Sequence, residues 1–252
     1  MTEIEGQHIS REQLKRICHR YHWAADQCQG VDVLEVACGA GQGLATLKRG
    51  ASSLVAGDYS PSVLAYARRI AADIPLSRFK AEALPFKAGS FDRILLFEAL
   101  YYVDAPAFFA EARRLLREGG MILIATANKD LYDFTPSAFA TRYLGAQELN
   151  HELRAVGFDV KLFGYLDTAT VSFRQRLLRP AKALASRLGF IPKTLRGRER
   201  LKKLFFGSLI EMPATIDGLA FTSEPASAIG GDVPDRRHKV LYCRAVLPRS
   251  TG

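Results

Sequence analysis

The chain has 252 residues, 48% of them hydrophobic and 24% charged, which is the balance of a globular protein with a sizeable buried core. This length accommodates one α/β domain with an insertion, or two small domains. The amino-terminal residues are polar and no stretch approaches the ~20 apolar residues of a membrane-spanning helix, so we expect neither a signal peptide nor a transmembrane segment. The cysteines are scattered without metal-ligand spacing, which predicts reduced thiols in a cytoplasmic protein.

The net charge of +9 is concentrated in one segment. Residues 174–203 contain eleven Lys or Arg and one acid, Glu199, so they carry +10 and the rest of the chain is close to neutral. An acidic partner is therefore expected at this segment.

The first helix is predicted over residues 9–27, within an amino-terminal helical cap of residues 1–30. Ser10 and Gln13 have the spacing of a capping box at its start. Tyr21, His22 and Trp23 come just before the first strand. They either pack against the sheet or form a flap over a ligand, with Tyr21 or His22 near it.

The stretch VDVLEVACGAGQGLATL, residues 31–47, organises the rest of the chain. Its apolar first half predicts a buried strand, and the glycines Gly39, Gly41 and Gly43 predict a turn that leads into a helix at Leu44. A strand, a glycine turn and a helix start form the usual layout of a nucleotide-cofactor site, although an ordinary turn of small residues has the same pattern. The last glycine of the dinucleotide fingerprint is replaced by Leu44.

Glu35 indicates which nucleotide would bind at this turn. A carboxylate at the end of the strand repels a pyrophosphate and attracts an ammonium or sulfonium group. The pattern therefore favours S-adenosylmethionine over NAD. Asp58 follows a second short strand, residues 53–57, where a carboxylate can accept hydrogen bonds from both ribose hydroxyls, or where it is only a turn residue.

Strands and helices continue to alternate along the chain. Further strands are predicted over residues 76–80, 90–97, 121–126, 158–166 and 239–247. Helices are predicted to begin at Pro61 and to span residues 105–117 and 148–156, and Gly119 and Gly120 are expected to end the second of these helices. This alternation predicts a doubly wound, mostly parallel sheet. The excursion over residues 168–237 is too long for a bare loop. We expect short basic helices over residues 180–188 and 198–206 and an exposed loop over residues 222–234.

Taken together, these motifs resemble those of class I S-adenosylmethionine-dependent methyltransferases. The resemblance rests on the glycine turn from Glu35 to Gly41, AEALPF at residues 81–86, SFD at residues 90–92 and REGG at residues 117–120. It implies a Rossmann-like seven-stranded sheet of order 3-2-1-4-5-7-6 with an antiparallel last strand. The core would span residues 31–167, a basic helical insertion residues 168–237, and the last strand and tail residues 238–252.

The resemblance also implies positions for the cofactor S-adenosyl-L-methionine. Glu35 and the carbonyl of Phe97 would approach the methionine amine, with Tyr21 near the same end. Asp58 would hold the ribose and Tyr59 would face the adenine. The remaining contacts implied are Ala37, Gly39, Gly41, Ala81 and Glu82.

Two positions depart from the family pattern. Ala37 replaces the first glycine of the turn and adds one methyl group near the ligand. Lys80 stands where many relatives carry an acid that accepts a hydrogen bond from the adenine amino group, and lysine cannot accept one. We expect Glu82 to take that role.

The catalytic groups are less constrained by the sequence. A hydroxyl acceptor needs a general base, whereas an amine needs only its neutral form. We expect Glu98 or His22 as base and Tyr102 as a positioning residue, although Tyr101 and Tyr102 can also simply pack a helix start. Further candidates are Asn128, Asp130 and Tyr132. Arg142 and Tyr143 either bind an acidic acceptor or form a solvated surface pair.

The expected function is methyl transfer to an oxygen or nitrogen of a small-molecule or carrier-linked acceptor. The basic segment is then a solvated lid, a dock for an anionic sugar or lipid acceptor, or a nucleic-acid surface, the last being least favoured because few aromatic residues are interleaved with its charges. The alternatives are an NAD-dependent oxidoreductase, which Glu35 disfavours, and a catalytically silent methyltransferase-like protein that binds a membrane or nucleic acid.

Overall fold

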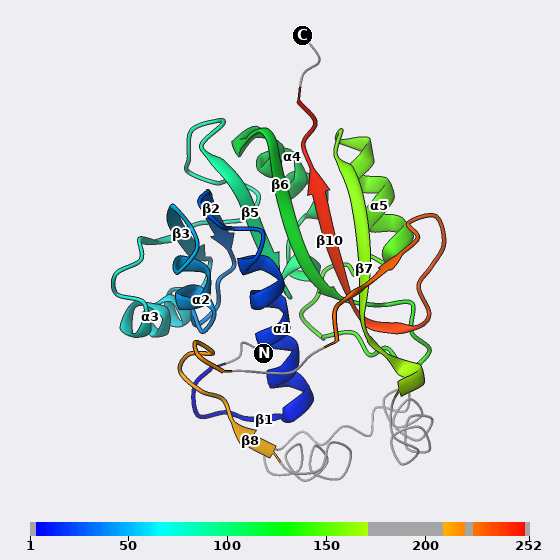
Figure 1. Ribbon diagram of the computed structural model, residues 1–252, viewed down its shortest axis with the longest axis horizontal. Helices are drawn as coiled ribbons and strands as arrows, with labels where there is room; N and C mark the ends of the chain where they lie inside the picture. Colours follow the sequence, from blue (N-terminus) through cyan, green and yellow to red (C-terminus); the bar gives the residue numbers. More distant parts are fainter. Residues whose placement is uncertain (1–3, 171–208, 220–223, 250–252) are drawn as a thin grey trace.

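The computed structural model describes residues 4–170, 209–219 and 224–249 (Figure 1). Its helices are α1 (Arg11–Ala25), α2 (Leu44–Lys48), α3 (Pro61–Ile70), α4 (Ala105–Leu115) and α5 (Ala146–Ala155), with short 3-10 helices η1 (Leu100–Tyr102) and η2 (Thr168–Thr170). The strands of the main sheet are β2 (Asp32–Val36), β3 (Ser53–Asp58), β4 (Leu76–Arg78), β5 (Phe91–Phe97), β6 (Leu116–Ala127), β7 (Asp159–Asp167), β9 (Ser227–Ile229) and β10 (His238–Val246). Strands β1 (His8–Ser10) and β8 (Leu209–Glu211) pair with each other in a separate small sheet.

The main sheet has the order β4-β3-β2-β5-β6-β10-β7-β9. Strands β4, β3, β2, β5 and β6 run parallel, and β10 lies antiparallel between β6 and β7. Helices α4 and α5 pack on one face, while α1, α2 and α3 pack on the other. In Figure 1, α1 lies in front of the sheet and α4 behind it. The architecture is a Rossmann-like α/β fold with a mixed sheet.

The sheet has eight strands rather than the seven expected, because β9 pairs with β7 at the edge. This strand falls within residues 222–234, where the sequence predicted only an exposed loop. The prediction was wrong there because a three-residue edge strand is set by its partner and leaves little periodic signal of its own.

The fifth predicted strand begins at Leu116 and not at Met121, so the preceding helix is shorter than expected. Gly119 and Gly120 were expected to end that helix. Instead the Gly119 N–H donates to the Leu247 carbonyl at 2.9 Å and the Leu247 N–H donates to the Gly120 carbonyl at 2.8 Å. The pair of glycines is therefore held inside the sheet by the end of β10.

The start of α1 is as predicted. The Ser10 hydroxyl accepts from the Gln13 N–H at 3.1 Å, which satisfies one of the free amide groups of the first turn. Towards the other end, the Trp23 ring stacks on Tyr242 of β10 at 4.9 Å, so this residue packs against the sheet. The cap thus stabilises the first turn of α1, and the Trp23 stack holds the last turns of the helix against β10.

The described part of the excursion after β7 contacts the glycine turn. The Gln42 carbonyl accepts from the Ile216 N–H at 3.1 Å and from the Thr215 hydroxyl at 3.3 Å. Met212 and Ile216 are buried in the core that α1 and α2 share. Residues 209–219 thus stabilise the glycine turn through the Gln42 carbonyl.

The basic segment 174–203 and the two helices predicted within residues 180–206 lie outside the described residues, and the domain boundaries stay predictions. None of the helices in the described ranges is long and apolar enough to cross a membrane. All four cysteines are buried free thiols.

Candidate functional site

A pocket of about 1390 Å³ opens at the carboxyl ends of the parallel strands. The ends of β2, β3 and β4 line one part of it, and the ends of β5 and β6, one face of α1 and residues 127–139 line the other. Ligand pockets usually hold roughly 300–1,000 Å³. The cavity therefore has room for two ligands side by side.

Eight of the ten predicted cofactor contacts line this pocket, namely Tyr21, Ala37, Gly39, Asp58, Tyr59, Ala81, Glu82 and Phe97. Gly41 does not line it. A Cβ on Gly41 would lie 3.1 Å from the Cβ of Ala67, so this glycine lets the turn pack closely against α3. The expectation that the backbone of Gly41 passes under a ligand stays a prediction.

Glu35 lies directly behind the pocket and is 1% exposed. Its Oε1 accepts from the Tyr21 hydroxyl at 2.6 Å, while its Oε2 has no hydrogen-bond partner among the described residues. Burial raises the pKa of Glu35 to about 7, although the Tyr21 hydrogen bond and the Arg20 charge lower it. A buried carboxylate oxygen without a partner costs free energy unless a donor binds to it. An ammonium group is a suitable donor.

The Tyr21 ring reaches Glu35 because the start of α2 has no side chain in its way. A Cβ on Gly43 would lie 2.2 Å from the Tyr21 ring. Burial and the Glu35 charge raise the pKa of Tyr21, so its hydroxyl stays protonated and donates. This hydrogen bond joins α1 to the end of β2, directly before the glycine turn.

Asp58 lies at the end of β3 and organises the opposite side of the turn. Its Oδ2 accepts from the Gly39 N–H at 3.1 Å and its Oδ1 from the Ser60 N–H at 2.8 Å. Each carboxylate oxygen has a second lone pair. The side chain therefore holds the turn and can still accept two hydrogen bonds from a diol.

The predicted adenine side of the pocket is more basic than the family pattern. Tyr59 is 57% exposed, and its ring centroid lies 5.2 Å from the Arg78 guanidinium and 5.7 Å from the Lys80 ammonium. Glu82 lines the pocket, but its Oε1 already accepts from the Asp104 N–H at 2.9 Å. Its other oxygen and the second lone pair of Oε1 are left for the role expected of Glu82, which stays a prediction.

Ala37 has a left-handed backbone conformation, with φ at 58°. L-residues other than glycine adopt this conformation at a cost of roughly 1–2 kcal/mol. The alanine that departs from the family pattern therefore sits where the backbone itself favours glycine. The site tolerates the extra methyl group at a price in stability.

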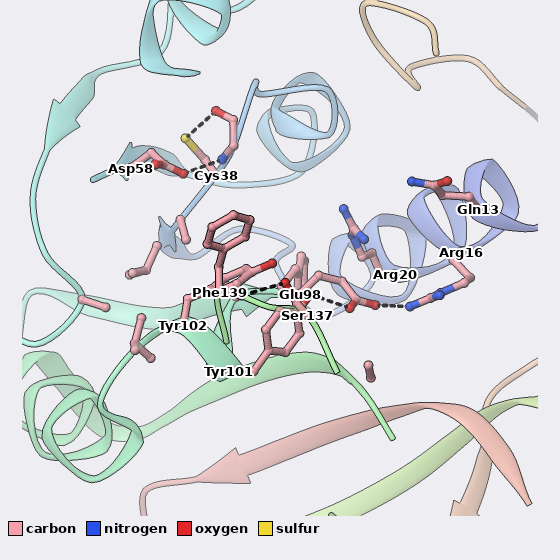
Figure 2. A pocket seen from close by; sticks show the side chains of 18 of the residues that line it. Gln13, Arg16, Arg20, Cys38, Asp58, Glu98, Tyr101, Tyr102, Ser137 and Phe139 are labelled. Atoms are coloured by element: carbon pink, nitrogen blue, oxygen red, sulfur yellow. Dashed lines mark hydrogen bonds and ion pairs between the residues drawn. The ribbon is translucent and has the colours of Figure 1, made fainter. Parts of the chain in front are cut away.

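Of the predicted catalytic residues, Glu98 and Tyr102 line the pocket and His22 does not. Consecutive helical residues point about 100° apart, so His22 cannot share the direction of Tyr21 on α1. The Glu98 carboxylate accepts from Arg16 at 2.6 Å and from the Tyr101 hydroxyl at 3.4 Å (Figure 2). The pocket thus brings together Glu98 and Tyr102 but not His22.

The structure adds residues that sequence reasoning missed. Gln13, Arg16 and Arg20 form one face of α1 that looks into the pocket (Figure 2). Their spacing of three and four residues is a helical stripe that the sequence did show. Phe134, Ser137 and Phe139 come from a loop, and no periodic signal marks them.

Other candidates have structural roles. The Asn128 side chain lines the pocket but donates to the carbonyls of Asp235 and His238 at 2.7 Å and 2.8 Å. Arg142 pairs with Glu152 at 2.8 Å, and the Tyr143 hydroxyl accepts from the Ser137 N–H at 3.1 Å. Neither Arg142 nor Tyr143 lines the pocket.

Comparison with known proteins agrees with this geometry. Residues 34–124 match the family described as "Methyltransferase domain". The chain is 31% identical over 146 residues to a probable S-adenosylmethionine-dependent methyltransferase of Mycolicibacterium smegmatis, covering 56% of this chain and 57% of that protein. It is 31% identical over 149 residues to a ubiquinone biosynthesis O-methyltransferase of Methylocella silvestris, covering 57% of each.

Among solved structures, the fold resembles a S-adenosylmethionine-dependent methyltransferase of Thermotoga maritima, described as a possible histamine N-methyltransferase. The TM-score is 0.56 at 18% identity, over 94% of this chain and 95% of that one. At this identity the likeness concerns the fold alone. The chain spans somewhat more than half the length of the curated relatives it matches.

Residues 34–124 therefore match a methyltransferase domain, and the chain has the fold of solved S-adenosylmethionine-dependent methyltransferases, whose cofactor is S-adenosyl-L-methionine.

The residues present fit that cofactor, and the buried Glu35 oxygen without a partner is the observation that tests the fit. An ammonium group would satisfy it, and the lone pairs of Asp58 suit a ribose diol. A nicotinamide dinucleotide would instead bring its pyrophosphate towards the turn and its buried carboxylate.

The raised pKa of Glu35 predicts how cofactor affinity changes with pH. Below pH 7 the carboxyl is increasingly neutral and attracts an ammonium group less, so S-adenosylhomocysteine should bind several-fold more tightly at pH 7.5 than at pH 6. Titration calorimetry across this range measures the change. Glu35→Gln should bind more weakly and with no pH dependence.

Tyr21→Phe serves as the matched variant. It removes a hydrogen bond that lowers the pKa of Glu35, so the same affinity change should move to higher pH. An unchanged pH profile in Glu35→Gln would show that another group causes it.

The backbone of Ala37 predicts an unusual response to glycine. Ala37→Gly should raise the free energy of unfolding by up to about 1 kcal/mol, because it relieves the left-handed strain. Ala65→Gly, an exposed position in the interior of α3, should lower it by about 1 kcal/mol, because glycine disfavours a helix interior. Urea denaturation of both variants measures the contrast, and equal losses in both would contradict the strain at Ala37.

Proposed function

We propose that this protein transfers a methyl group from S-adenosylmethionine to an oxygen or nitrogen of a small-molecule or carrier-linked acceptor. The observation that carries the proposal is the buried Glu35 carboxylate behind the glycine turn, with one oxygen left for a donor. The pocket volume supports it, because a methyl donor and an acceptor must be held together.

Each side of the turn has its own part in holding the cofactor. Glu35 binds the amino group, with the Tyr21 hydroxyl fixing the direction of the carboxylate. Asp58 accepts from the ribose hydroxyls, and Tyr59 faces the adenine. When bound, S-adenosylmethionine supplies a methyl group on a positively charged sulfur, which leaves as a neutral thioether.

On the acceptor side, Glu98 is the group that receives a proton. Its φ of 50° turns the side chain out of β5 into the pocket, and the Arg16 guanidinium holds the carboxylate at 2.6 Å. Glu98 therefore serves best by orienting the acceptor hydroxyl and taking its proton as the new bond forms.

The curated relatives support an acceptor of this kind. The relative from Methylocella silvestris is named an O-methyltransferase of ubiquinone biosynthesis. An oxygen acceptor is therefore favoured for this chain, while nitrogen stays open because a neutral amine needs no base.

Titration calorimetry with S-adenosylmethionine, S-adenosylhomocysteine and NAD tests the cofactor. The two sulfur nucleotides should bind with micromolar dissociation constants and NAD should not bind. Asp58→Ala should weaken both by at least tenfold, because two hydroxyl partners are lost. Asp73→Ala, which changes an exposed carboxylate outside the pocket, should bind as the native protein does.

Binding without turnover in an acceptor screen would favour the silent binding protein, and failure of both sulfur nucleotides to bind would refute the methyltransferase assignment.

Glu98→Gln tests the acceptor side. With a hydroxyl acceptor from the screen, kcat should fall by about 10²–10⁴-fold, the usual contribution of proton transfer, while S-adenosylhomocysteine affinity stays unchanged. Stopped-time assays of S-adenosylhomocysteine production measure kcat. Glu118→Gln, an exposed residue outside the pocket, is the control and should retain full activity. Full activity in Glu98→Gln would remove Glu98 from the reaction.

A further inference from the structure

One wall of the acceptor half of the pocket is aromatic. Tyr101, Tyr102, Phe134 and Phe139 all line the cavity. Figure 2 shows Tyr101, Tyr102 and Phe139 on the other side of Glu98 from Arg16 of α1. None of these rings belongs to the expected cofactor contacts.

The back of this wall is packed and fixed. Tyr101 stacks on Tyr143 with centroids 4.5 Å apart, and Phe134 meets the edge of Tyr143 at 4.7 Å. The Thr141 N–H donates to the Tyr101 carbonyl at 2.7 Å, which ties the loop back onto η1. The wall is therefore preorganised and needs little ordering to bind a ligand.

Two rings on the pocket side of this wall are exposed to solvent. Phe139 is 84% exposed and Tyr102 is 40% exposed, although both line the pocket. Exposed apolar rings grouped at a concave site mark a binding surface. The Phe139 N–H also donates to the Ser137 hydroxyl at 3.4 Å, which supports the backbone that presents this ring.

We infer that the methyl acceptor carries a planar aromatic ring that binds against Tyr102 and Phe139, with its reacting hydroxyl towards Glu98. This inference rests on the proposed function and names the substrate class of the same site. Ring faces and edges attract one another beyond simple burial, which adds roughly two- to tenfold in affinity for each well-formed pair. A saturated ring of equal size would fill the same space without that gain.

Two hydroxyl compounds of matched size, naphthalen-2-ol and decahydronaphthalen-2-ol, separate these cases. Each is titrated into the full chain saturated with S-adenosylhomocysteine. The native protein should bind naphthalen-2-ol at least tenfold more tightly. Phe139→Ala and Tyr102→Ala should each reduce that preference by twofold or more. Tyr132→Ala is the matched control, because this ring is 59% exposed in the same loop but does not line the pocket.

Equal binding of the two compounds, binding of neither, or an equal loss of preference in Tyr132→Ala would overturn the aromatic assignment. S-adenosylhomocysteine affinity is measured for every variant and should not change. If that affinity is present while the aromatic preference is absent, only this inference fails. If S-adenosylhomocysteine does not bind the native protein, the proposed function itself fails.

Discussion

The hydrogen bond between the Tyr21 hydroxyl and the buried Glu35 carboxylate is the interaction on which the site depends. Burial of a carboxylate is costly, and one oxygen without a partner makes it more so. The rest of the local structure accommodates this group: Gly43 leaves space for the Tyr21 ring, and α1 is capped at Ser10 and stacked on β10 through Trp23. A bound cationic ligand would offset the free-energy cost of burying the Glu35 carboxylate.

The pocket has a cofactor half and an acceptor half, and different secondary-structure elements build each of them. The cofactor half comes from turns that follow β2, β3 and β4, and these turns are held rigidly by Asp58 and by residues 209–219 behind Gln42. The acceptor half comes from α1, η1 and a loop, whose contacts are side-chain pairs such as Arg16 with Glu98. Different elements therefore build the two halves, as expected of a fold on which different acceptor sites are built.

Sequence reasoning was most successful where local rules govern the chain. The glycine turn, the Ser10 cap and the proline at the start of α3 each follow from backbone preferences of a few residues, and the structure has them in place. The predictions were less successful where contacts with residues far away in the sequence determine the structure. Gly119 and Gly120 were predicted to end a helix but belong to β6, because Leu247, directly after β10, makes the hydrogen bonds that hold them in the strand. Of the two α1 residues expected near the site, Tyr21 lines the pocket and His22 does not, while Arg16 and Arg20 line it without having been expected there.

The sequence by itself determined the class of fold, the position of the glycine turn and the two carboxylates, Glu35 and Asp58, that suit the cofactor. These features are local, since strand, turn and cap patterns are encoded within a few consecutive residues. Only the tertiary structure decided which oxygen of Glu35 is left without a partner, that Arg16 holds Glu98, and that rings from two separate segments form one wall. These contacts join residues far apart in the chain, and the distance between such residues is set by packing, which no local pattern records.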